Sequence, residues 1–232
     1  MFQNCNEIEY LDLSNFDTSN ITDMGGMFSK CHKLKEIKGI NKFNTGKINI
    51  MRKIFQECKE LKNLDLSNFD TSNVVDMGFM FNECHKLKEI KGINKFNTSK
   101  VNNLRAMFQD CNEIEYLDFT INVSIMEGMF NKCYKLKEIK GINKFNTSKV
   151  NNMKAMFQEC KELKYLDLSN FDTSNITNMK GMFCNCNKLA SLNLLNFSVK
   201  NNCNIQNIFA FNSKKQFWLI TNNDILKYLY NS

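Results

Sequence analysis

One short pattern repeats along almost the whole chain. An apolar residue followed by Phe recurs at steps of 26 or 27 residues, with a single shorter step of 22 residues between Met107 and Met129. The recurring apolar residues are Met1, Met27, Ile54, Met80, Met107, Met129, Met156, Met182 and Ile208. A fixed period in this range is typical of a solenoid, in which each repeat folds as one small unit and stacks on its neighbours. The repeat therefore constrains the fold more than length or composition does.

Each repeat predicts a strand, a turn and a short helix. In one repeat, four apolar residues have the spacing i, i+3, i+4 and i+7 of a helical face: Met153, Met156, Phe157 and Cys160. Leu166 and Leu168 alternate with polar residues, which is the period of a half-buried strand. The Asp-Thr-Ser-Asn segment at 172–175 favours a turn. Stacked repeats of this kind predict a parallel sheet on one face and helices on the other.

The motif L-x-x-L-x-L, present here as Leu163, Leu166 and Leu168, is the leucine-rich-repeat pattern. The longer motif, in which LDLSNFDTSN is followed at fixed spacing by Met, Met-Phe, Cys and Leu, resembles the BspA-like repeats of bacterial, mycoplasmal and protist surface proteins. The resemblance covers Met1 to about Phe209. It implies an α/β leucine-rich-repeat solenoid with a parallel β-sheet on one face and short helices on the other. It also implies a cell-surface or secreted location, since family members are mostly described as adhesins, lipoproteins or proteins of unknown function.

The domain organisation follows from where the pattern stops. We expect a solenoid of about eight rungs over residues 1–211, starting in the middle of a repeat, and a C-terminal cap over residues 212–232. In the cap, 217–220 is predicted to be a strand and 224–230 a helix with Thr221 as its N-cap. Met1 occupies the repeat's own Met position and its flanking sequence is no signal peptide. Either a truncated product or an unusual natural start would explain this.

Two repeat types alternate along the chain. Type one carries LDLSNFDTSN, and type two carries KEIKGINKFNT, which is identical from Lys35, Lys88 and Lys137. The glycine of type two predicts a small bulge beside the strand. One type-one rung, which starts at Leu117, lacks four residues of its turn. Its strand and helix can both survive, and the shortened turn reflects either neutral drift or a local notch for a ligand.

Eight of the ten cysteines occupy one position of the repeat: Cys5, Cys31, Cys58, Cys84, Cys111, Cys133, Cys160 and Cys186. We expect a column of small buried thiols facing the core. Parallel side-chain directions oppose disulfides between neighbouring rungs, and the regular column lacks the clustered spacing of a zinc site. Cys184 and Cys203 break the register and are the thiols expected to be exposed.

The sequence argues against an enzyme. Its two histidines, His32 and His85, follow core cysteines and are expected to face solvent. No nucleophile elbow, phosphate loop, paired-histidine metal motif or dinucleotide-binding fingerprint occurs in the chain. We therefore predict no catalytic residue, no cofactor and no metal.

The outward positions of the predicted strands form the most informative surface. The central outward column alternates in charge over most of its length: Asp12, Lys38, Asp65, Lys91, Asp118, Lys140, Asp167 and Asn193. The neighbouring column carries Tyr10, Tyr116 and Tyr165. Opposite charges about 5 Å apart would stabilise the sheet itself by a few tenths of a kcal/mol per pair. Alternatively, the same residues form a mixed-charge recognition face with the tyrosines as anchors.

The net charge of +7 bears on possible partners. A sheet whose charges neutralise each other is a poor track for nucleic acid, so nucleic acid is not expected as a ligand. The excess of positive charge lies in the type-two turns, at Lys42, Lys47, Lys95, Lys100, Lys144 and Lys149. These lysines form either a basic stripe for an acidic partner or a solvated edge.

We therefore predict a monomeric, non-catalytic scaffold that recognises a protein or surface polymer through its sheet face. Two alternatives remain at this stage. One is an intracellular protein-interaction repeat, and the other is a fragment of a larger multidomain effector or surface protein.

Overall fold

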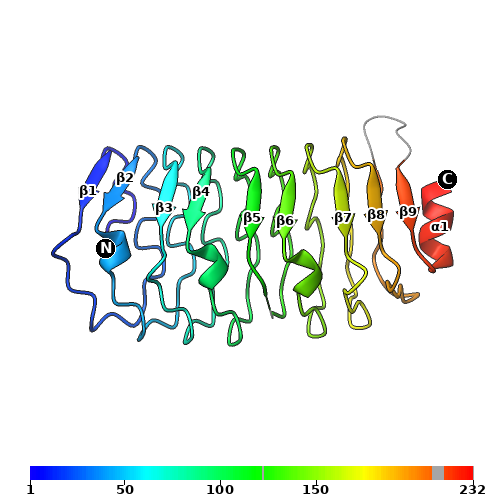
Figure 1. The fold of residues 1–232 in the computed structure, drawn as a ribbon, viewed down its shortest axis with the longest axis horizontal. Coiled ribbons are helices and arrows are strands. Elements are labelled where there is room, and N and C mark those ends of the chain that lie inside the picture. Colours follow the sequence, from blue (N-terminus) through cyan, green and yellow to red (C-terminus); the bar gives the residue numbers. More distant parts are fainter. Residues whose placement is uncertain (122, 211–216, 232) are drawn as a thin grey trace.

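The computed structural model describes residues 1–121, 123–210 and 217–231. The chain forms an elongated solenoid in which successive rungs stack along one axis (Figure 1). Each rung contributes one strand of three residues, whose central side chain points toward the core. The strands are β1 (Tyr10–Asp12), β2 (Glu36–Lys38), β3 (Asn63–Asp65), β4 (Glu89–Lys91), β5 (Tyr116–Asp118), β6 (Glu138–Lys140), β7 (Tyr165–Asp167), β8 (Ser191–Asn193) and β9 (Trp218–Ile220).

The strands do not form one continuous sheet. They pair in parallel as β1–β2, β3–β4 and β5–β6, and as the triplet β7–β8–β9. Each break follows a type-two rung. The prediction of a single parallel sheet is therefore corrected to four short sheets in a row.

A glycine explains where the breaks fall. Gly39 follows β2 with a left-handed φ of 83° and begins the 3-10 helix η1 (Ile40–Lys42). A Cβ on Gly39 would lie 2.5 Å from the Cα of Ser14, so this turn lies directly against the preceding rung. The predicted bulge is thus a 3-10 turn, and it recurs as η2 (Ile93–Lys95) and η3 (Ile142–Lys144). The rung of β8 has Leu194 and Leu195 in place of the glycine turn, and there the pairing continues into β9.

The predicted short helices are wrong: residues 153–160 form consecutive tight turns. Alternate backbone amides there bond to the next rung, as when the Phe157 N–H donates to the Met182 carbonyl at 3.0 Å. The amides between them bond within the rung, as when the Met156 N–H donates to the Met153 carbonyl at 3.2 Å. An α-helix would use all of these amides internally and leave none to join rungs.

Left-handed residues make this turn geometry possible. Ala155 and Glu159 have φ values of 54° and 59°, and the equivalent positions of other rungs are also positive. The turns return every third or fourth side chain to the core, so their sequence has the same apolar spacing as a helix. A row of bridges runs without interruption along this side, through Asp23, Ile50, Asp76, Asn103, Ile125, Asn152, Asn178 and Asn204.

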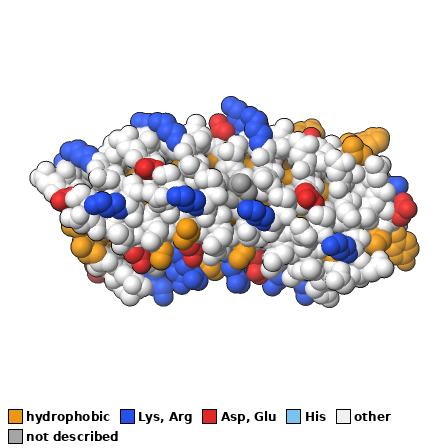
Figure 2. Space-filling model, turned by 90° about the horizontal axis from the view of Figure 1, so that it is seen from below, with side chains coloured by type: hydrophobic (Ala, Val, Ile, Leu, Met, Phe, Trp, Pro, Cys, Tyr) orange, Lys and Arg blue, Asp and Glu red, His pale blue; other side chains and the backbone are white. Residues whose placement is uncertain are grey.

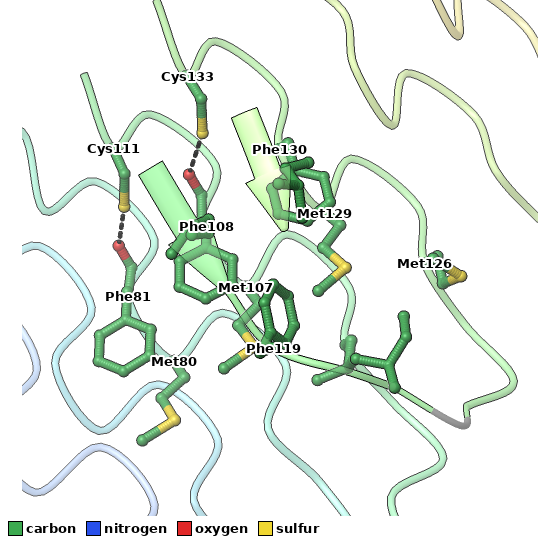
Figure 3. Packing of buried hydrophobic residues seen from close by; sticks show 14 of the residues in the cluster. Met80, Phe81, Met107, Phe108, Cys111, Phe119, Met126, Met129, Phe130 and Cys133 are labelled. Carbon is green, nitrogen blue, oxygen red and sulfur yellow. Dashed lines mark hydrogen bonds between the residues drawn. The ribbon is translucent and has the colours of Figure 1, made fainter. Parts of the chain in front are cut away.

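Stacked phenylalanines form the axis of the core. Successive rings from Phe2 to Phe209 lie 5.4 to 6.0 Å apart between centroids and are nearly parallel. Figure 3 shows Phe81, Phe108 and Phe130 in this column, beside a column of methionines. Burying one such side chain stabilises the fold by about 1.5–3 kcal/mol. The solenoid is therefore one continuous apolar core, although its sheet is interrupted.

The short rung keeps this core intact. Its strand β5 is present, as predicted, and Phe108 and Phe130 stack at 5.8 Å across it. Phe119 stands where other type-one rungs have Leu, and its ring packs edge-on against Phe108 and Phe145 at 5.6 and 5.5 Å. It therefore fills the volume of the phenylalanine that the missing turn would have supplied.

The C-terminal segment contains the predicted strand and helix. β9 pairs with β8, and α1 (Asp224–Asn231) follows with Leu226 fully buried. Asn223, rather than the predicted Thr221, is the N-cap, because its Oδ1 accepts the Leu226 N–H at 3.1 Å. The end of the solenoid at residue 211 and residues 212–216 and 232 of the proposed cap lie outside the described residues.

Candidate functional site

The outward charges of the strands form pairs within each two-stranded unit. The ammonium groups of Lys38, Lys91 and Lys140 lie 2.7, 3.5 and 3.7 Å from the carboxylates of Asp12, Asp65 and Asp118, respectively. Within the described ranges, no ion pair joins one two-stranded unit to the next along this column. The predicted continuous charge ladder is therefore corrected to separate pairs, because the sheet itself is interrupted.

Hydrogen bonds hold these carboxylates ionised and oriented. The Lys38 ammonium, together with Ser14, holds the pKa of Asp12 well below its ordinary value. The pKa of Asp65 is also lowered, first by the Ser67 hydroxyl and backbone N–H and only then by Lys91. Both carboxylates stay charged at neutral pH, and both lie on the exposed face.

The three predicted aromatic anchors are exposed. Tyr10, Tyr116 and Tyr165 have 64%, 61% and 71% of their surface accessible. The ammonium groups of Lys35 and Lys137 lie 5.7 Å from the ring centroids of Tyr10 and Tyr116. A cation over an aromatic face restrains the ring without covering it. Tyr165 lies on the same strand as Asp167, and the residue that pairs with Asp167 on the neighbouring strand is the neutral Asn193 instead of a lysine.

Two hollows open on this face where the strand units part. The larger, with a volume of about 790 Å³, lies between β4 and β5, and the other, of about 590 Å³, lies between β2 and β3. The larger hollow brings together Tyr116, Asp118 and Lys140, and the second brings together Lys38, Asp65 and Lys91.

Other predicted site residues lie outside these two hollows: Tyr10, Asp12, Tyr165 and Asp167. Sequence reasoning missed Glu89 and Ile90, which line the larger hollow from β4. The glycine of type two was the available signal, since it marks where the sheet divides.

The predicted burial of the thiol column is found for seven of its eight members, and Cys5 at its start is half-buried. Each sulfur from Cys31 to Cys186 in the column donates to a phenylalanine carbonyl of the rung before it, for example Cys84 Sγ to Phe55 O at 3.0 Å. Burial raises the pKa of these thiols, that of Cys186 to about 12. They are therefore neutral and poor nucleophiles at physiological pH.

Three further side chains test the predicted exposure. Cys184 is half-buried, whereas Cys203 is buried, so the expectation of an exposed Cys203 is wrong. The imidazole of His32 is also less open than expected, because its Nε2 lies 3.2 Å from a carboxylate oxygen of Glu57. No group of three or more His, Cys, Asp or Glu residues in the described part of the chain is arranged to hold a metal ion.

The predicted lysine stripe is exposed along the type-two turns. Lys47 and Lys100 each donate to an asparagine of the preceding type-one rung, at 3.3 and 2.7 Å. Figure 2 shows basic side chains spaced along one side of the molecule with acidic side chains among them. This edge is a row of separated positive charges and not a dense basic patch.

A family model described as "Mycoplasma protein of unknown function, DUF285" matches residues 1–117 and 111–223. The chain belongs to this family. The predicted membership in a mycoplasmal repeat family is thereby confirmed. No curated protein matches the sequence.

Two solved structures match this DUF285 protein at low sequence identity. One is a leucine-rich cell surface protein from Faecalibacterium prausnitzii A2-165, with 14% identity over 100% of this chain and 77% of that protein, and a TM-score of 0.35. The other is a leucine-rich repeat protein from Bacteroides ovatus ATCC 8483, with 13% identity over 90% of this chain and 55% of that protein, and a TM-score of 0.47. In the described part of this DUF285 protein, no helix has the length and apolar character needed to cross a membrane.

Proposed function

We propose that this DUF285 protein is a non-catalytic scaffold that recognises a protein or surface polymer through its outward sheet face. The observation that carries the proposal is the hollow between β4 and β5, where an exposed tyrosine lies beside paired charges. Tyrosines next to oriented charged groups are typical anchors of protein interfaces. We infer a monomer that acts at the cell surface, in keeping with the surface protein of similar architecture.

The recognition face has a defined extent in this proposal. Its residues are Tyr10, Asp12, Lys38, Asp65, Lys91, Tyr116, Asp118, Lys140, Tyr165 and Asp167. The core behind them is rigid, because every rung is tied to its neighbours by backbone hydrogen bonds and stacked rings. Rigid placement of exposed anchors lowers the entropy cost of binding.

A pull-down from cell extracts and from surface glycans tests this proposal with two matched triple variants. The sheet-face variant is Tyr116→Ser, Asp118→Asn and Lys140→Gln, which removes one ring and one ion pair without changing the net charge. The control variant makes the same three changes on α1, as Tyr228→Ser, Asp224→Asn and Lys227→Gln. In α1 the tyrosine is also exposed and the lysine and aspartate are 3.1 Å apart.

We expect specific partners to be lost from the sheet-face variant and kept by the α1 variant. Circular dichroism should show that both variants remain folded, because all six side chains are on the surface. Partners retained equally by both variants would contradict recognition through the sheet face.

A further inference from the structure

On the turn side of the solenoid, a cluster of basic side chains lies around one phenylalanine ring. The residue before each Met-Phe or Ile-Phe pair has a left-handed backbone, with φ between 51° and 64°. This column consists of Gly26, Lys53, Phe79, Ala106, Gly128, Ala155, Gly181 and Asn207. A bulky side chain is strongly disfavoured at such a φ, and Phe79 is the one aromatic residue of the column. The left-handed φ belongs to the turn geometry of all these rungs, so the distinguishing feature of this rung is the bulky ring at that position.

Three cations surround the Phe79 ring. The Arg52 guanidinium carbon lies 5.6 Å from the ring centroid, and the Lys53 nitrogen and the Arg105 guanidinium carbon each lie 5.8 Å from it. Arg52 and Lys53 come from the rung before Phe79, and Arg105 comes from the rung after it. Arg52 and Arg105 are the only two arginines in the chain. The Phe79 N–H also donates to the Arg105 carbonyl at 2.8 Å, which fixes the two rungs together at this point.

The cluster carries an excess of positive charge. Within the described residues, Arg52 and Lys53 make no ion pair, and Arg105 shares the Glu127 carboxylate with Lys154 at 3.6 Å each. On the same side of the rungs before and after Arg52, Asp23 and Asp76 each accept hydrogen bonds: Asp23 Oδ1 from the backbone of Gly25, and Asp76 Oδ1 from the backbone of Gly78 and from Asn103. The positive charges of Arg52 and Lys53 therefore have no ion-pair partner among the described residues.

The repeat position between the two arginines carries no side chain. Arg52 and Arg105 occupy the same repeat position two rungs apart, and the position between them is Gly78, which has no side chain. Both arginines are exposed, and the Phe79 ring beside them is half-buried. All three cations lie within 5.8 Å of the Phe79 ring centroid, so rotation of their side chains can bring at least two onto one anion.

We propose that Arg52, Lys53 and Arg105, gathered around Phe79, form a binding site for a tetrahedral oxyanion, the phosphate or sulfate group of an ester. The guanidinium fork matches the geometry of such groups and binds them through two parallel hydrogen bonds. A doubly charged anion also matches the unpaired charge of the cluster. The core separates this site from the outward side of the strands, so it is independent of recognition by the sheet face.

The pair of arginines permits a direct test by NMR. Labelling the protein with 15N-arginine gives two side-chain Nε–H signals, which Arg52→Gln and Arg105→Gln assign. Sodium phosphate and sodium sulfate are titrated separately, with the ionic strength held constant by sodium chloride. We expect both signals to shift saturably with at least one of the two oxyanions. If phosphate binds more tightly than sulfate, the natural ligand is a phosphate ester, and if sulfate binds more tightly, it is a sulfate ester. Shifts that do not saturate with either oxyanion would overturn the proposal.

Variants distinguish a built site from general attraction of anions. Arg52→Gln should weaken binding at the remaining Arg105 signal at least tenfold, whereas Lys180→Gln, at the same repeat position as Arg52 but away from the ring, should leave it unchanged. Equal effects of these two variants would contradict the proposed site. Phe79→Gly removes the ring while relieving the left-handed strain, so it should raise the melting temperature and weaken oxyanion binding. Undiminished binding in Phe79→Gly would show that the ring does not assemble the site.

Discussion

Single residues of this protein act through close contact between neighbouring rungs. Gly92 is the clearest case, because its φ is 88° and a Cβ there would lie 2.4 Å from the Cα of Ser67. Gly141 has a similar φ of 82°, but the nearest atom to its Cβ would be the Phe119 carbonyl oxygen, at 3.1 Å. The two glycines therefore separate the cost of a left-handed backbone from the cost of a collision with the preceding rung.

We predict that Gly92→Ala destabilises the protein more than Gly141→Ala does. The backbone strain common to both should cost about 1–3 kcal/mol, and the collision with Ser67 adds to it only in Gly92→Ala. Urea unfolding of the two variants beside the parent protein measures the difference. Equal destabilisation would show that the turn can move away from the preceding rung at little cost.

Each outward residue of the strands was predictable by itself, because side chains alternate along a strand between the core and the solvent. Which of them lie together was not. Tyr116 and Lys140 share a hollow with Glu89, which belongs to a different strand unit.

At the scale of elements, each strand is only three residues long, and its stability depends on the rungs on either side. β5 illustrates this, because its rung lacks the usual turn and Phe119 fills the vacated volume. The Phe119 ring contacts those of Phe108, Phe130 and Phe145. In a complete rung, Phe171 contacts two aromatic rings among the described residues, those of Phe145 and Phe197.

We therefore predict that Phe119→Ala destabilises the protein by about 3–5 kcal/mol, the usual range for a buried phenylalanine. Phe171→Ala is the matched control, and its cost should be smaller because its ring has fewer aromatic neighbours. Thermal and urea unfolding of both variants measure the two costs. A loss below about 1 kcal/mol for Phe119→Ala would contradict its role as the filler of the short rung.

The incorrect helix prediction also belongs to this scale. Apolar spacing reports which side chains return to the core, and both a helix and a series of tight turns satisfy it. The hydrogen bonds of alternate amides to the next rung decide between them, and those partners are about 25 residues away in the sequence.

At the scale of the whole molecule, one continuous core runs beneath an interrupted sheet. Rings and thiols stack along its full length, so access to the cysteines reports on the integrity of the entire solenoid. Of the ten thiols, only Cys5 and Cys184 are partly exposed in the folded chain.

We predict that a maleimide reagent labels Cys5 and Cys184 in the native protein and leaves the other eight thiols unmodified. Burial and the raised pKa of the column thiols both oppose their reaction, since the thiolate is the reactive form. Mass spectrometry of peptides after timed labelling gives the rate at each cysteine, and urea-unfolded protein provides the reference for full reaction. Labelling of Cys84 or Cys133 as fast as Cys184 would indicate that the stacked core opens in solution.

The sequence by itself determined the solenoid, the number and spacing of its rungs, the buried columns of Phe, Met and Cys, and the outward columns of charge and tyrosine. These features follow from the alternation of apolar and polar residues and from the repeat period, both of which can be read directly from the sequence. Only the tertiary structure decided that tight turns replace helices, that the sheet divides after each glycine turn, and that Phe79 gathers both arginines. Each of these depends on contact between rungs, where small shifts of backbone position decide which hydrogen bonds form and which side chains meet.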